Sequence, residues 1–509
     1  MLQIKDLTIT HKKDLRTILE NFSLTLNAGD KAVIIGEEGN GKSTLLKLIF
    51  DEKLVRDYVE YSGEIIKSRL HFGYLAQELT EEQKANSIFT YCSKIPGFLD
   101  QAPKELAKIA FSLGFDPSLL YSDQTIATLS GGEKVKLQLA GIFMTQPDVL
   151  LLDEPSNDID LDTLKWLENF INSCNLPILF VSHDETLIEN TANVIIHLEQ
   201  LRRKTTPHYT IAKMSYREYK KRRSTKLSHQ EQMAKKEESE YRKQQEKLTQ
   251  IQSKVEHQQN TISRADAHGG RLLKKKMRAV KSMGKRMEKS HQNNTQSPDI
   301  EEAIMLHFDK DITLPSGKTV LNFTLDQLHI NERILAQNIK LNIIGPQKIC
   351  ITGKNGIGKT TLLKLIAQDL INRKDLNVAY MPQNYEDLLD FSKTPVEFLA
   401  KTHEKKELTK IRSFLGSVKY TTDEMDHQIA EMSGGQKAKL LFLKMILDGC
   451  NVLILDEPTR NFSPLSNPVI RSILKSYGGA IISISHDRKY IEEVCDQVYQ
   501  LTESGLLLS

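Results

Sequence analysis

Four short motifs occur twice in this chain, in the same order and at matching intervals. The first half carries GEEGNGKST (36–44), LSGGEKVKL (129–137), VLLLDEP (149–155) and FVSHD (180–184), and the second half carries GKNGIGKTT (353–361), MSGGQKAKL (432–440), VLILDEP (452–458) and SISHD (483–487). In each copy 24 residues lead from the serine of the second motif to the glutamate of the third, and 29 more lead to the histidine of the fourth. Four motifs repeated at fixed intervals indicate two copies of one domain.

The repeat divides the 509 residues into three parts. We expect a first domain over 1–205, a linker over 206–300 and a second domain over 301–509. The copies differ in one interval, because 35 residues separate Lys42 from Gln77 but only 24 separate Lys359 from Gln383. The first copy therefore holds a short insertion, which we place near 51–72.

The first motif predicts a phosphate-binding loop between a buried strand and a helix. Its glycines let backbone N–H groups turn inward around phosphate oxygens, and the helix presents the positive end of its dipole to the same charge. Lys42 or Lys359 would reach the β- and γ-phosphates, and the hydroxyl of Ser43 or Thr360 would ligate Mg²⁺. An ordinary strand–turn–helix is the alternative, but the flanking strand and helix favour the loop in both copies. The expected ATP-binding residues are Gly36, Gly39, Gly41, Lys42, Ser43 and Thr44, and Gly353, Gly356, Gly358, Lys359, Thr360 and Thr361.

The third motif predicts a magnesium ligand followed by a catalytic base. Four apolar residues make a strand that is buried on both faces. Its C-terminal end delivers Asp153 or Asp456 to Mg²⁺. The next carboxylate, Glu154 or Glu457, lies where a base can polarise the attacking water.

The second motif opens a helix in each copy, KVKLQLAGIF and KAKLLFLKMI. A serine and two glycines at a helix start make a second anion-binding site, which we expect to be built by Ser130, Gly131 and Gly132 and by Ser433, Gly434 and Gly435. A simple N-cap is the alternative, although capping alone does not require Ser-Gly-Gly-Glu/Gln-Lys twice.

Two further residue types in each copy can contact the phosphates or the metal ion. His183 and His486 each follow an apolar strand and can hydrogen-bond the γ-phosphate; a histidine at a strand end with only a structural role is the alternative. Gln77 in YLAQ and Gln383 in YMPQ are expected to contact the metal ion or water.

Together these motifs resemble those of the ABC ATPase family, over about 1–200 and 301–509. The resemblance implies an α/β fold with two tandem ABC-type P-loop NTPase domains joined by a long α-helical hairpin, and hydrolysis of ATP with Mg²⁺. In that family the cassettes pair head to tail, so that the first motif (Walker A) of one copy faces the serine-glycine motif (signature) of the other. One site would join the Lys42 copy to Ser433–Gly435, and the other would join the Lys359 copy to Ser130–Gly132. ATP closes such a pair and hydrolysis reopens it.

Two departures from the family pattern stand out. The family stacks an aromatic ring on adenine upstream of Walker A, whereas the nearest candidates here are His11 and His329. After the third motif (Walker B), the segment known as the D-loop reads SNDID (156–160) in the first copy. In the second copy it reads TRNFSPLS (459–466) and lacks the expected aspartate. We therefore expect the two sites to differ.

Cysteine usage and hydropathy favour a cytoplasmic protein. The five cysteines are odd in number and form no CxxC pair, which fits reduced thiols better than a disulfide framework. No apolar run approaches the roughly 20 residues that cross a bilayer. The first residues, MLQIKDLTI, alternate like a strand and show no signal-peptide pattern.

The linker concentrates positive charge. Residues 211–300 hold 23 Lys and Arg against 10 Asp and Glu, a net charge of +13, whereas the rest of the chain carries −10. Few Gly or Pro interrupt 214–258, so we expect a polar helix of about 36 residues, roughly 54 Å long. A second helix over 271–289 would return beside it through a tip within about 245–270, with Leu272, Leu273, Met277 and Met287 facing the first helix. A basic arm of this kind can reach into RNA, and a solvated coiled-coil spacer is the alternative.

Tandem cassettes with a basic helical linker and no membrane segment resemble the ABC-F family of ribosome-associated ATPases. The short insertion, the long linker and TRNFSPLSNP are similar to its antibiotic-resistance branch, of the Vga, Lsa and Vml type. The resemblance implies a monomer that binds the 70S ribosome through the E site. Its linker would contact 23S rRNA and P-site tRNA and displace lincosamide, pleuromutilin or streptogramin A drugs. The alternatives are a housekeeping ABC-F translation factor and the ATPase component of a drug exporter.

Overall fold

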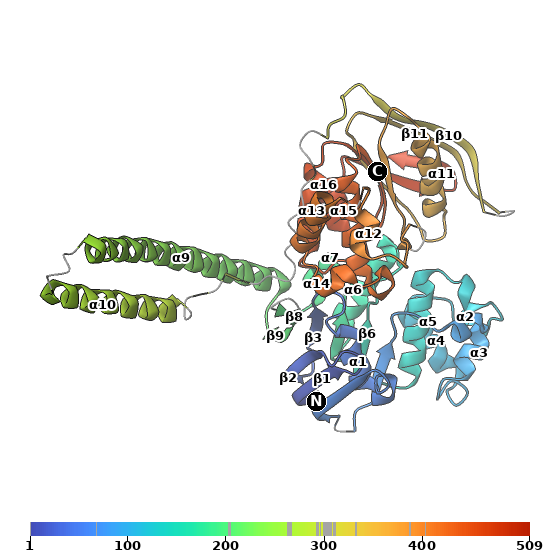
Figure 1. Cartoon of the computed structure of the whole chain (residues 1–509). Helices are drawn as coiled ribbons and strands as arrows, with labels where there is room; N and C mark the ends of the chain where they lie inside the picture. The colour runs from blue at the N-terminus through green and yellow to red at the C-terminus, as the bar shows by residue number, and fades with distance from the viewer. Residues whose placement is uncertain are drawn as a thin grey trace. The chain divides into compact units, whose positions relative to one another are not determined.

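The computed structural model of the chain describes residues 2–67, 69–201, 205–261, 267–291, 295, 297–298, 308, 312–330, 333–385, 388–402 and 404–508. These residues belong to two compact units (Figure 1). One unit comprises Met1–Tyr216 together with Glu301–Ser509 and contains both cassettes. The other unit is Arg217–Ile300.

A six-stranded sheet forms the centre of the first cassette. Its strand order is β5–β6–β7–β3–β8–β9, and all neighbours are parallel except β8 and β9. The central strands β3, β6 and β7 are buried at every residue, as expected for a parallel sheet covered on both faces. The strands are β3 (Lys31–Ile35), β5 (Phe72–Leu75), β6 (Val149–Asp153), β7 (Ile178–Val181), β8 (Val194–Gln200) and β9 (Thr206–Ala212).

A smaller antiparallel sheet shares the core of the first cassette. It consists of β1 (Leu2–His11), β2 (Thr17–Leu26) and β4 (Val59–Ile66) in the order β2–β1–β4. Its apolar side chains pack in one cluster with those of β3 and α1. The extra residues that the sequence places near 51–72 form the short helix η1 (Glu52–Leu54) and then β4, which pairs with β1.

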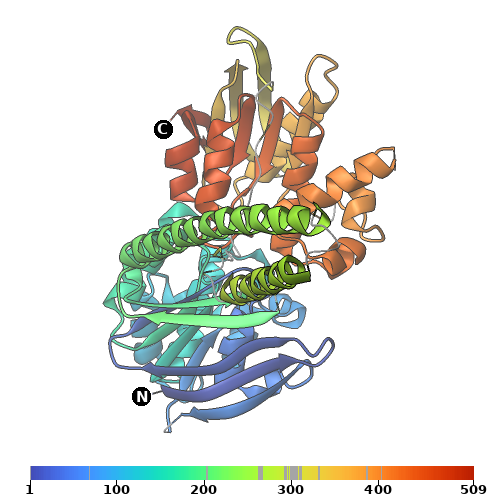
Figure 2. The same ribbon diagram turned by 60° about the vertical axis from the view of Figure 1, so that its left-hand side comes forward.

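The second cassette repeats this plan. Its six-stranded sheet has the order β13–β14–β15–β12–β16–β17. Its antiparallel sheet contains two strands, β10 and β11, in the part of the chain described here (Figure 2). The strands are β10 (Thr319–Ile330), β11 (Arg333–Ile344), β12 (Lys348–Thr352), β13 (Val378–Met381), β14 (Val452–Asp456), β15 (Ala480–Ile484), β16 (Gln497–Thr502) and β17 (Gly505–Leu508).

Helices flank both sheets. In the first cassette they are α1 (Lys42–Phe50), α2 (Glu81–Ala85), α3 (Ile88–Ser93), α4 (Pro103–Ser112), η2 (Pro117–Tyr121), η3 (Ile126–Thr128), α5 (Gly131–Met144), α6 (Leu161–Ser173) and α7 (Glu185–Thr191). In the second they are α11 (Lys359–Ile371), α12 (Pro395–Leu399), α13 (Lys405–Ser417), α14 (Thr422–Asp426), η5 (Ile429–Glu431), α15 (Gly434–Leu447), α16 (Asn467–Ser476) and α17 (Arg488–Val494). The described part of the chain has no helix with the length and apolar character needed to cross a membrane.

The first cassette extends further along the chain than the sequence indicated. Residues 206–212 are strand β9, which pairs antiparallel with β8. The chain leaves this unit only after Tyr216, whose ring is fully buried and whose hydroxyl donates to the carbonyl of Pro464 at 3.1 Å. The expected boundary after residue 205 is therefore too early. The reason is that TPHYTIA, with a proline and little apolar character, gives no clear strand signal at the edge of a sheet.

Buried charges join the two cassettes. Arg471 on α16 is 1 % exposed, and its guanidinium lies 2.8 Å from the carboxylates of Glu185 on α7 and Glu493 on α17. Lys489 on α17 lies 3.2 Å from Glu185 and forms a second pair with Glu189. Glu493 belongs to the same cassette as Arg471, whereas Glu185 and Glu189 belong to the other cassette. Because removing a charge from water costs several kcal/mol, Glu185 depends on Arg471 and Lys489 across the seam.

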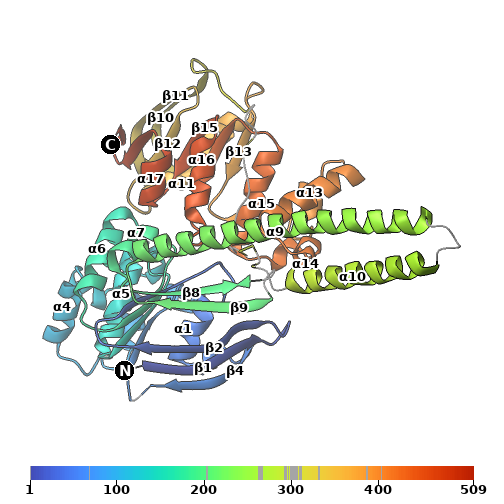
Figure 3. The ribbon, with the colours of Figure 1, turned by 90° about the vertical axis from the view of Figure 1, so that its left-hand side faces the viewer.

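The other unit is a pair of helices, α9 (Tyr216–Thr261) and α10 (Ala267–His291), which run side by side (Figures 1 and 3). With 46 residues α9 is about 69 Å long, which exceeds the expected length. The tip was expected somewhere within 245–270; α9 and α10 occupy 245–261 and 267–270 of this stretch, and 262–266 lie outside the described residues.

The two helices pack through a stripe that repeats every three or four residues. On α10 the less exposed residues are Leu273, Met277, Val280, Gly284, Met287 and His291, and on α9 they include Ala234, Glu237, Tyr241, Leu248, Gln252, Val255 and Gln259. Tyr241 stacks on His291 with ring centroids 3.8 Å apart. A side chain at Gly284 would come within 3.2 Å of Leu248, so this glycine allows close contact between the helices. Leu272 was wrongly placed in the stripe, since it is 50 % exposed.

The buried ion pair at the seam makes a specific prediction about stability. Replacing Arg471 with alanine leaves Glu185 buried with one partner fewer, and we expect a loss of about 3 kcal/mol. The double variant R471M/E185L should regain most of that loss, because an apolar pair of similar volume replaces both charges. Urea unfolding of the cassette unit measures both effects. Glu493→Gln is the control, because this carboxylate is half-exposed and should contribute about 1 kcal/mol or less. An equal loss of stability in the Glu493→Gln control would contradict the role given to the Arg471–Glu185 pair.

Candidate functional site

The first Walker A motif forms a tight loop between β3 and α1. Gly36, Gly39 and Gly41 all have positive φ angles, and a side chain at Gly36 would overlap the carbonyl of Leu198. The buried Lys42 folds back over the loop and donates to the carbonyls of Gly36 and Glu37 at 2.9 and 3.0 Å. The ammonium thus lies inside the ring of the loop.

Walker B of the first cassette brings three predicted side chains together. Ser43, next to Lys42, donates to Asp153 at 2.8 Å, and burial raises the pKa of Asp153. Glu154 has a positive φ angle and accepts from the backbone N–H of His183 at 3.2 Å, while its other oxygen lies 3.1 Å from His183 Nε2. Burial acts to raise the pKa of Glu154, but His183 and Lys42 outweigh burial and hold it below its ordinary value.

The second cassette has the same arrangement with different electrostatics. Lys359 donates to the carbonyls of Gly353 and Lys354 at 2.9 and 3.0 Å. Glu457 accepts from the backbone N–H of His486 at 3.2 Å, but His486 Nε2 lies 3.9 Å away. Burial, reinforced by neighbouring Asp456, raises the pKa of Glu457 to about 8. Burial, helped by Lys359, lowers the pKa of His486 to about 4.

Both signature serines cap helices. Ser130 caps α5 and Ser433 caps α15, and each forms a capping box with the residue three positions later, Glu133 or Gln436. The capping role that was the alternative interpretation is therefore real. The glycine N–H groups of the first helical turn have no partner within the helix, so they can bind an anion at its N-terminus.

A cavity of about 760 Å³ brings the second Walker A and the first signature together. Of the predicted residues it is lined by Ser130, Gly131, His183, Gly356, Gly358, Lys359, Thr360, Thr361, Gln383, Asp456, Glu457 and His486. Asp158 from the first D-loop also lines it, and its backbone carbonyl accepts from the side-chain amide of Asn355. A volume of this size lies within the roughly 300–1,000 Å³ of small-molecule sites.

The first Walker A and the second signature also meet, but side chains of this protein fill the contact. Glu38 of the Walker A loop accepts a hydrogen bond from the backbone N–H of Gly435. His183 Nδ1 lies 2.9 Å from the carbonyl of Phe462 in the second D-loop. The head-to-tail pairing implied by the resemblance is thus present on both sides.

The glutamines of the two copies differ. Gln383 lies at the cavity and donates to Asp158 at 3.4 Å. Gln77 follows β5, is exposed and makes no hydrogen bond within the described part of the chain. The structure therefore gives a local environment that fits the expectation only for Gln383.

Sequence reasoning missed one wall of the cavity, in the region upstream of Walker A where an adenine contact was expected. His329 does not line the cavity and bonds Gln327 instead, and His11 pairs with Asp14. The wall consists of Ile330, Arg333, Ile334 and Leu335, at the end of β10 and the start of β11. An aromatic ring was expected in this region, but Arg333 can serve as well, because a guanidinium also stacks on flat rings.

ATP and Mg²⁺ fit the groups present. Asp456 Oδ2 is buried and makes no hydrogen bond in the described structure, so an oxygen is available to a cation beside Thr360. In the first cassette Ser43 and Asp153 lie 2.8 Å apart, a separation that fits two adjacent ligands of one Mg²⁺. The two lysines supply positive charge inside each phosphate loop.

A sequence model described as ABC transporter matches residues 19–157 and 336–460, together just over half of the chain. The chain belongs to the ABC transporter family. It carries two copies of the family's ATP-binding domain and is an ATPase.

Similar proteins match nearly the whole length of this chain and about three quarters of their own. The probable ATP-binding protein YheS of Escherichia coli K12 is 26 % identical over 96 % of this chain and 77 % of its own length. ABC transporter F family member 5 of Arabidopsis thaliana is also 26 % identical, over 96 % of this chain and 73 % of its own. The fold is similar to a crystal structure of archaeal ribosome recycling factor aABCE1 in complex with ribosomal stalk protein aP1, with a TM-score of 0.56, 16 % identity, and coverage of 97 % of this chain and 87 % of that one. The chain is thus related to ATP-binding proteins that include members of the ABC transporter F family.

The cavity wall leads to a prediction for Arg333. If its guanidinium stacks on adenine, Arg333→Ala should weaken ATP binding at the second Walker A about two- to fivefold, the effect of an exposed cation–π contact. Titration with a fluorescent ATP analogue in a Lys42→Ala background reports on that site alone. Lys340→Ala removes an exposed charge from the same strand and should leave the affinity unchanged. A similar loss in both variants would exclude a specific stacking role.

Proposed function

We propose that this chain hydrolyses ATP at two composite sites between its cassettes and uses the cycle to bind and leave the ribosome through its basic helical arm, α9 and α10. The observation that carries the proposal is the cavity where one Walker A loop faces the other cassette's signature loop. The name of the aABCE1 structure, a ribosome recycling factor, supports the choice of the ribosome, as does the match to F family proteins.

The site residues divide the work at each composite site. Lys42 and Lys359 hold the phosphates, and the glycine N–H groups of the opposing signature loop hold the γ-phosphate. Ser43 with Asp153, or Thr360 with Asp456, would hold Mg²⁺, which would offset the negative charge of the ATP phosphates. Glu154 and Glu457 orient the attacking water and accept its proton, while His183 and His486 fix these carboxylates through their backbone N–H groups.

The surface of the arm fits a polyanion. Between Ala267 and His291, α10 carries nine Lys and Arg and one acidic residue. All nine basic side chains are exposed, because the stripe that packs on α9 takes the other positions: Arg271, Lys274, Lys275, Lys276, Arg278, Lys281, Lys285, Arg286 and Lys289. Phosphate contacts of such residues supply affinity without sequence specificity, as ribosomal RNA binding by shape requires.

The first test traps the closed state. The double variant E154Q/E457Q loses both bases, so hydrolysis should fall at least about 100-fold. With ATP it should remain closed and co-sediment with 70S ribosomes, and with ADP it should not. Absence from the ribosomal pellet in ATP would refute the proposed partner, while leaving the ATPase assignment intact.

Three lysines test the contribution of the arm. In the trapped protein, replacing Lys274, Lys275 and Lys276 with alanine should weaken ribosome binding and lower the salt dependence of log K by about 2–3, since each lost phosphate contact removes one counterion. The matched control replaces the exposed lysines of α13, Lys405, Lys406 and Lys410. Equal effects in both triple variants would show only general charge attraction.

Two finer roles are compatible with this activity, ribosome protection against antibiotics and a housekeeping translation factor. The second D-loop TRNFSPLSNP and the long arm, similar to those of the resistance branch, favour protection. In that role the tip displaces lincosamide, pleuromutilin or streptogramin A drugs from the peptidyl-transferase centre, in contact with 23S rRNA and P-site tRNA.

Drug tolerance decides between the two roles. Expression in a sensitive bacterium should raise the inhibitory concentration of at least one of the three drug classes.

A shortened arm provides a second test. The residue numbers of facing positions on α9 and α10 sum to 532, as in Tyr241 with His291 and Leu248 with Gly284. Deleting 252–258 together with 274–280 therefore removes one facing heptad and shortens the arm by about 10 Å. This variant should lose protection and keep ATPase activity; unchanged tolerance with the full-length chain would favour the housekeeping role.

A further inference from the structure

The two composite sites carry their negative charge on opposite sides of the seam. At the second site the Walker A loop is Gly353-Lys354-Asn355, and the facing D-loop contains Asp158 and Asp160. At the first site the Walker A loop is Gly36-Glu37-Glu38, and the facing D-loop has Asn461 and Ser463 at the corresponding positions. The first site thus has two carboxylates in its phosphate loop, whereas the second site has two in the facing D-loop.

Glu37 is fully engaged across the seam. It is buried, with 8 % exposure, and lies 3.1 Å from the ammonium of Lys439 on α15. It also accepts hydrogen bonds from Ser463, at 2.7 Å, and Ser466 in the second D-loop. Its charge is therefore compensated, and it links the first phosphate loop to the second cassette.

Glu38 has a different kind of partner. Its carboxylate accepts from the backbone N–H of Gly435, in the first turn of α15. Both carboxylate oxygens lie close to this turn, because a Cβ added at Gly434 would approach them to 3.3 and 3.4 Å. An anion thus occupies the end of a helix dipole and one of its unsatisfied N–H groups.

The corresponding residue of the second cassette behaves differently. Asn355 donates its amide to the backbone carbonyl of Asp158, and its oxygen accepts from Lys359 at 3.4 Å. It is neutral and donates to the D-loop, whereas Glu38 is an anion that accepts from the signature loop. The signature N–H groups that face Asn355 therefore have no carboxylate competing for them from the phosphate loop.

We infer that Glu38 is a built-in competitor of the γ-phosphate at the first composite site, and so makes that site weaker for ATP than the second. A single N–H cannot serve a carboxylate and a phosphate oxygen at once, and two anions at one helix end repel each other. ATP must therefore displace Glu38 before the first site closes on it. ADP has no γ-phosphate to place there, so Glu38 lowers affinity for ATP more than for ADP.

This inference rests on the proposed role of Ser433–Gly435 as the γ-phosphate site, but it requires no ribosome. The test uses the purified full chain in a Lys359→Ala background, so that only the first Walker A binds, and measures affinity for the ATP analogue AMPPNP and for ADP. Glu38→Asn, which restores the residue of the second copy, should raise the AMPPNP-to-ADP affinity ratio about tenfold, the worth of one charge-assisted hydrogen bond. An unchanged ratio, or equal gains for both nucleotides, would overturn the inference.

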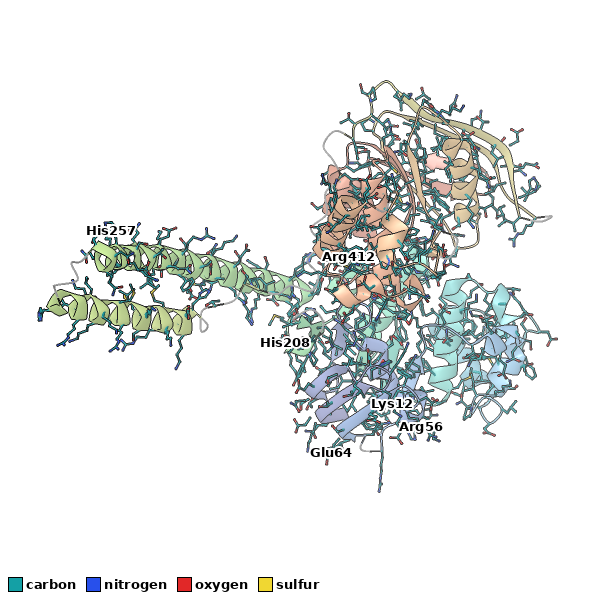
Figure 4. All side chains as sticks on the ribbon, in the orientation of Figure 1. Lys12, Arg56, Glu64, His208, His257 and Arg412 are labelled. Atoms are coloured by element: carbon teal, nitrogen blue, oxygen red, sulfur yellow. The ribbon has the colours of Figure 1, made fainter. Side chains whose placement is uncertain are left out.

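A mirror variant and a charge control complete the experiment. Asn355→Glu in a Lys42→Ala background should lower the same ratio at the second site, which keeps the test decisive if Glu38→Asn folds poorly. Glu64→Asn removes an equal charge from an exposed position on β4 and should leave the ratio unchanged (Figure 4). If neither Lys359→Ala nor Lys42→Ala protein binds AMPPNP, the site assignment itself fails; if both bind and Glu38→Asn does not alter the ratio, only the competitor role falls.

Discussion

The pairing of charges buried at the seam between the cassettes is the interaction on which the rest of the structure depends. Arg471 with Glu185, and Glu37 with Lys439, place charges where water is largely excluded, and each pair joins one half of the chain to the other. Such pairs add little net stability compared with apolar contacts, but they penalise any arrangement that separates the partners. They therefore specify how the halves align, which in turn sets each Walker A loop against a signature loop.

The same seam makes the two nucleotide sites unequal. Glu154 has a histidine nitrogen 3.1 Å from its carboxylate and a lowered pKa, whereas Glu457 is 3.9 Å from its histidine and has a pKa near 8. The first site is filled by Glu38 and the second opens into a cavity. A protein with unequal sites can bind nucleotide in a defined order, since the two free energies of binding need not match.

The phosphate-binding motifs could be predicted from the sequence more readily than the elements that surround them. Repeated motifs predicted the residues around Lys42 and Lys359 because phosphate binding depends on local loop geometry, which a short segment determines by itself. Strand β9 and the packing stripe of α9 escaped notice, since neither has a strong apolar pattern and both are defined by a partner element. The stripe includes Glu237, Gln252 and Gln259, residues that normally suggest solvent exposure.

Arg333 and Glu38 were missed for a related reason. Only the fold shows that Arg333 lines the cavity and that Glu38 meets Gly435, almost 400 positions away. The unusual Glu-Glu in GEEGNGKST and the missing aspartate in TRNFSPLS were both visible, but only the fold shows that they face each other. Compensating differences on the two sides of an interface can be recognised only when the interface is known.

One uninterrupted helix, α9, has a mechanical consequence. Its first residue, Tyr216, is anchored in the cassette unit by a hydrogen bond to Pro464, in the same D-loop that holds Glu37. A rod of about 69 Å converts a rotation of about 5° at its root into a displacement of about 6 Å at the far end. Angular changes too small to disturb a packed core can thus become movements as large as a nucleotide base, provided that the rod does not bend.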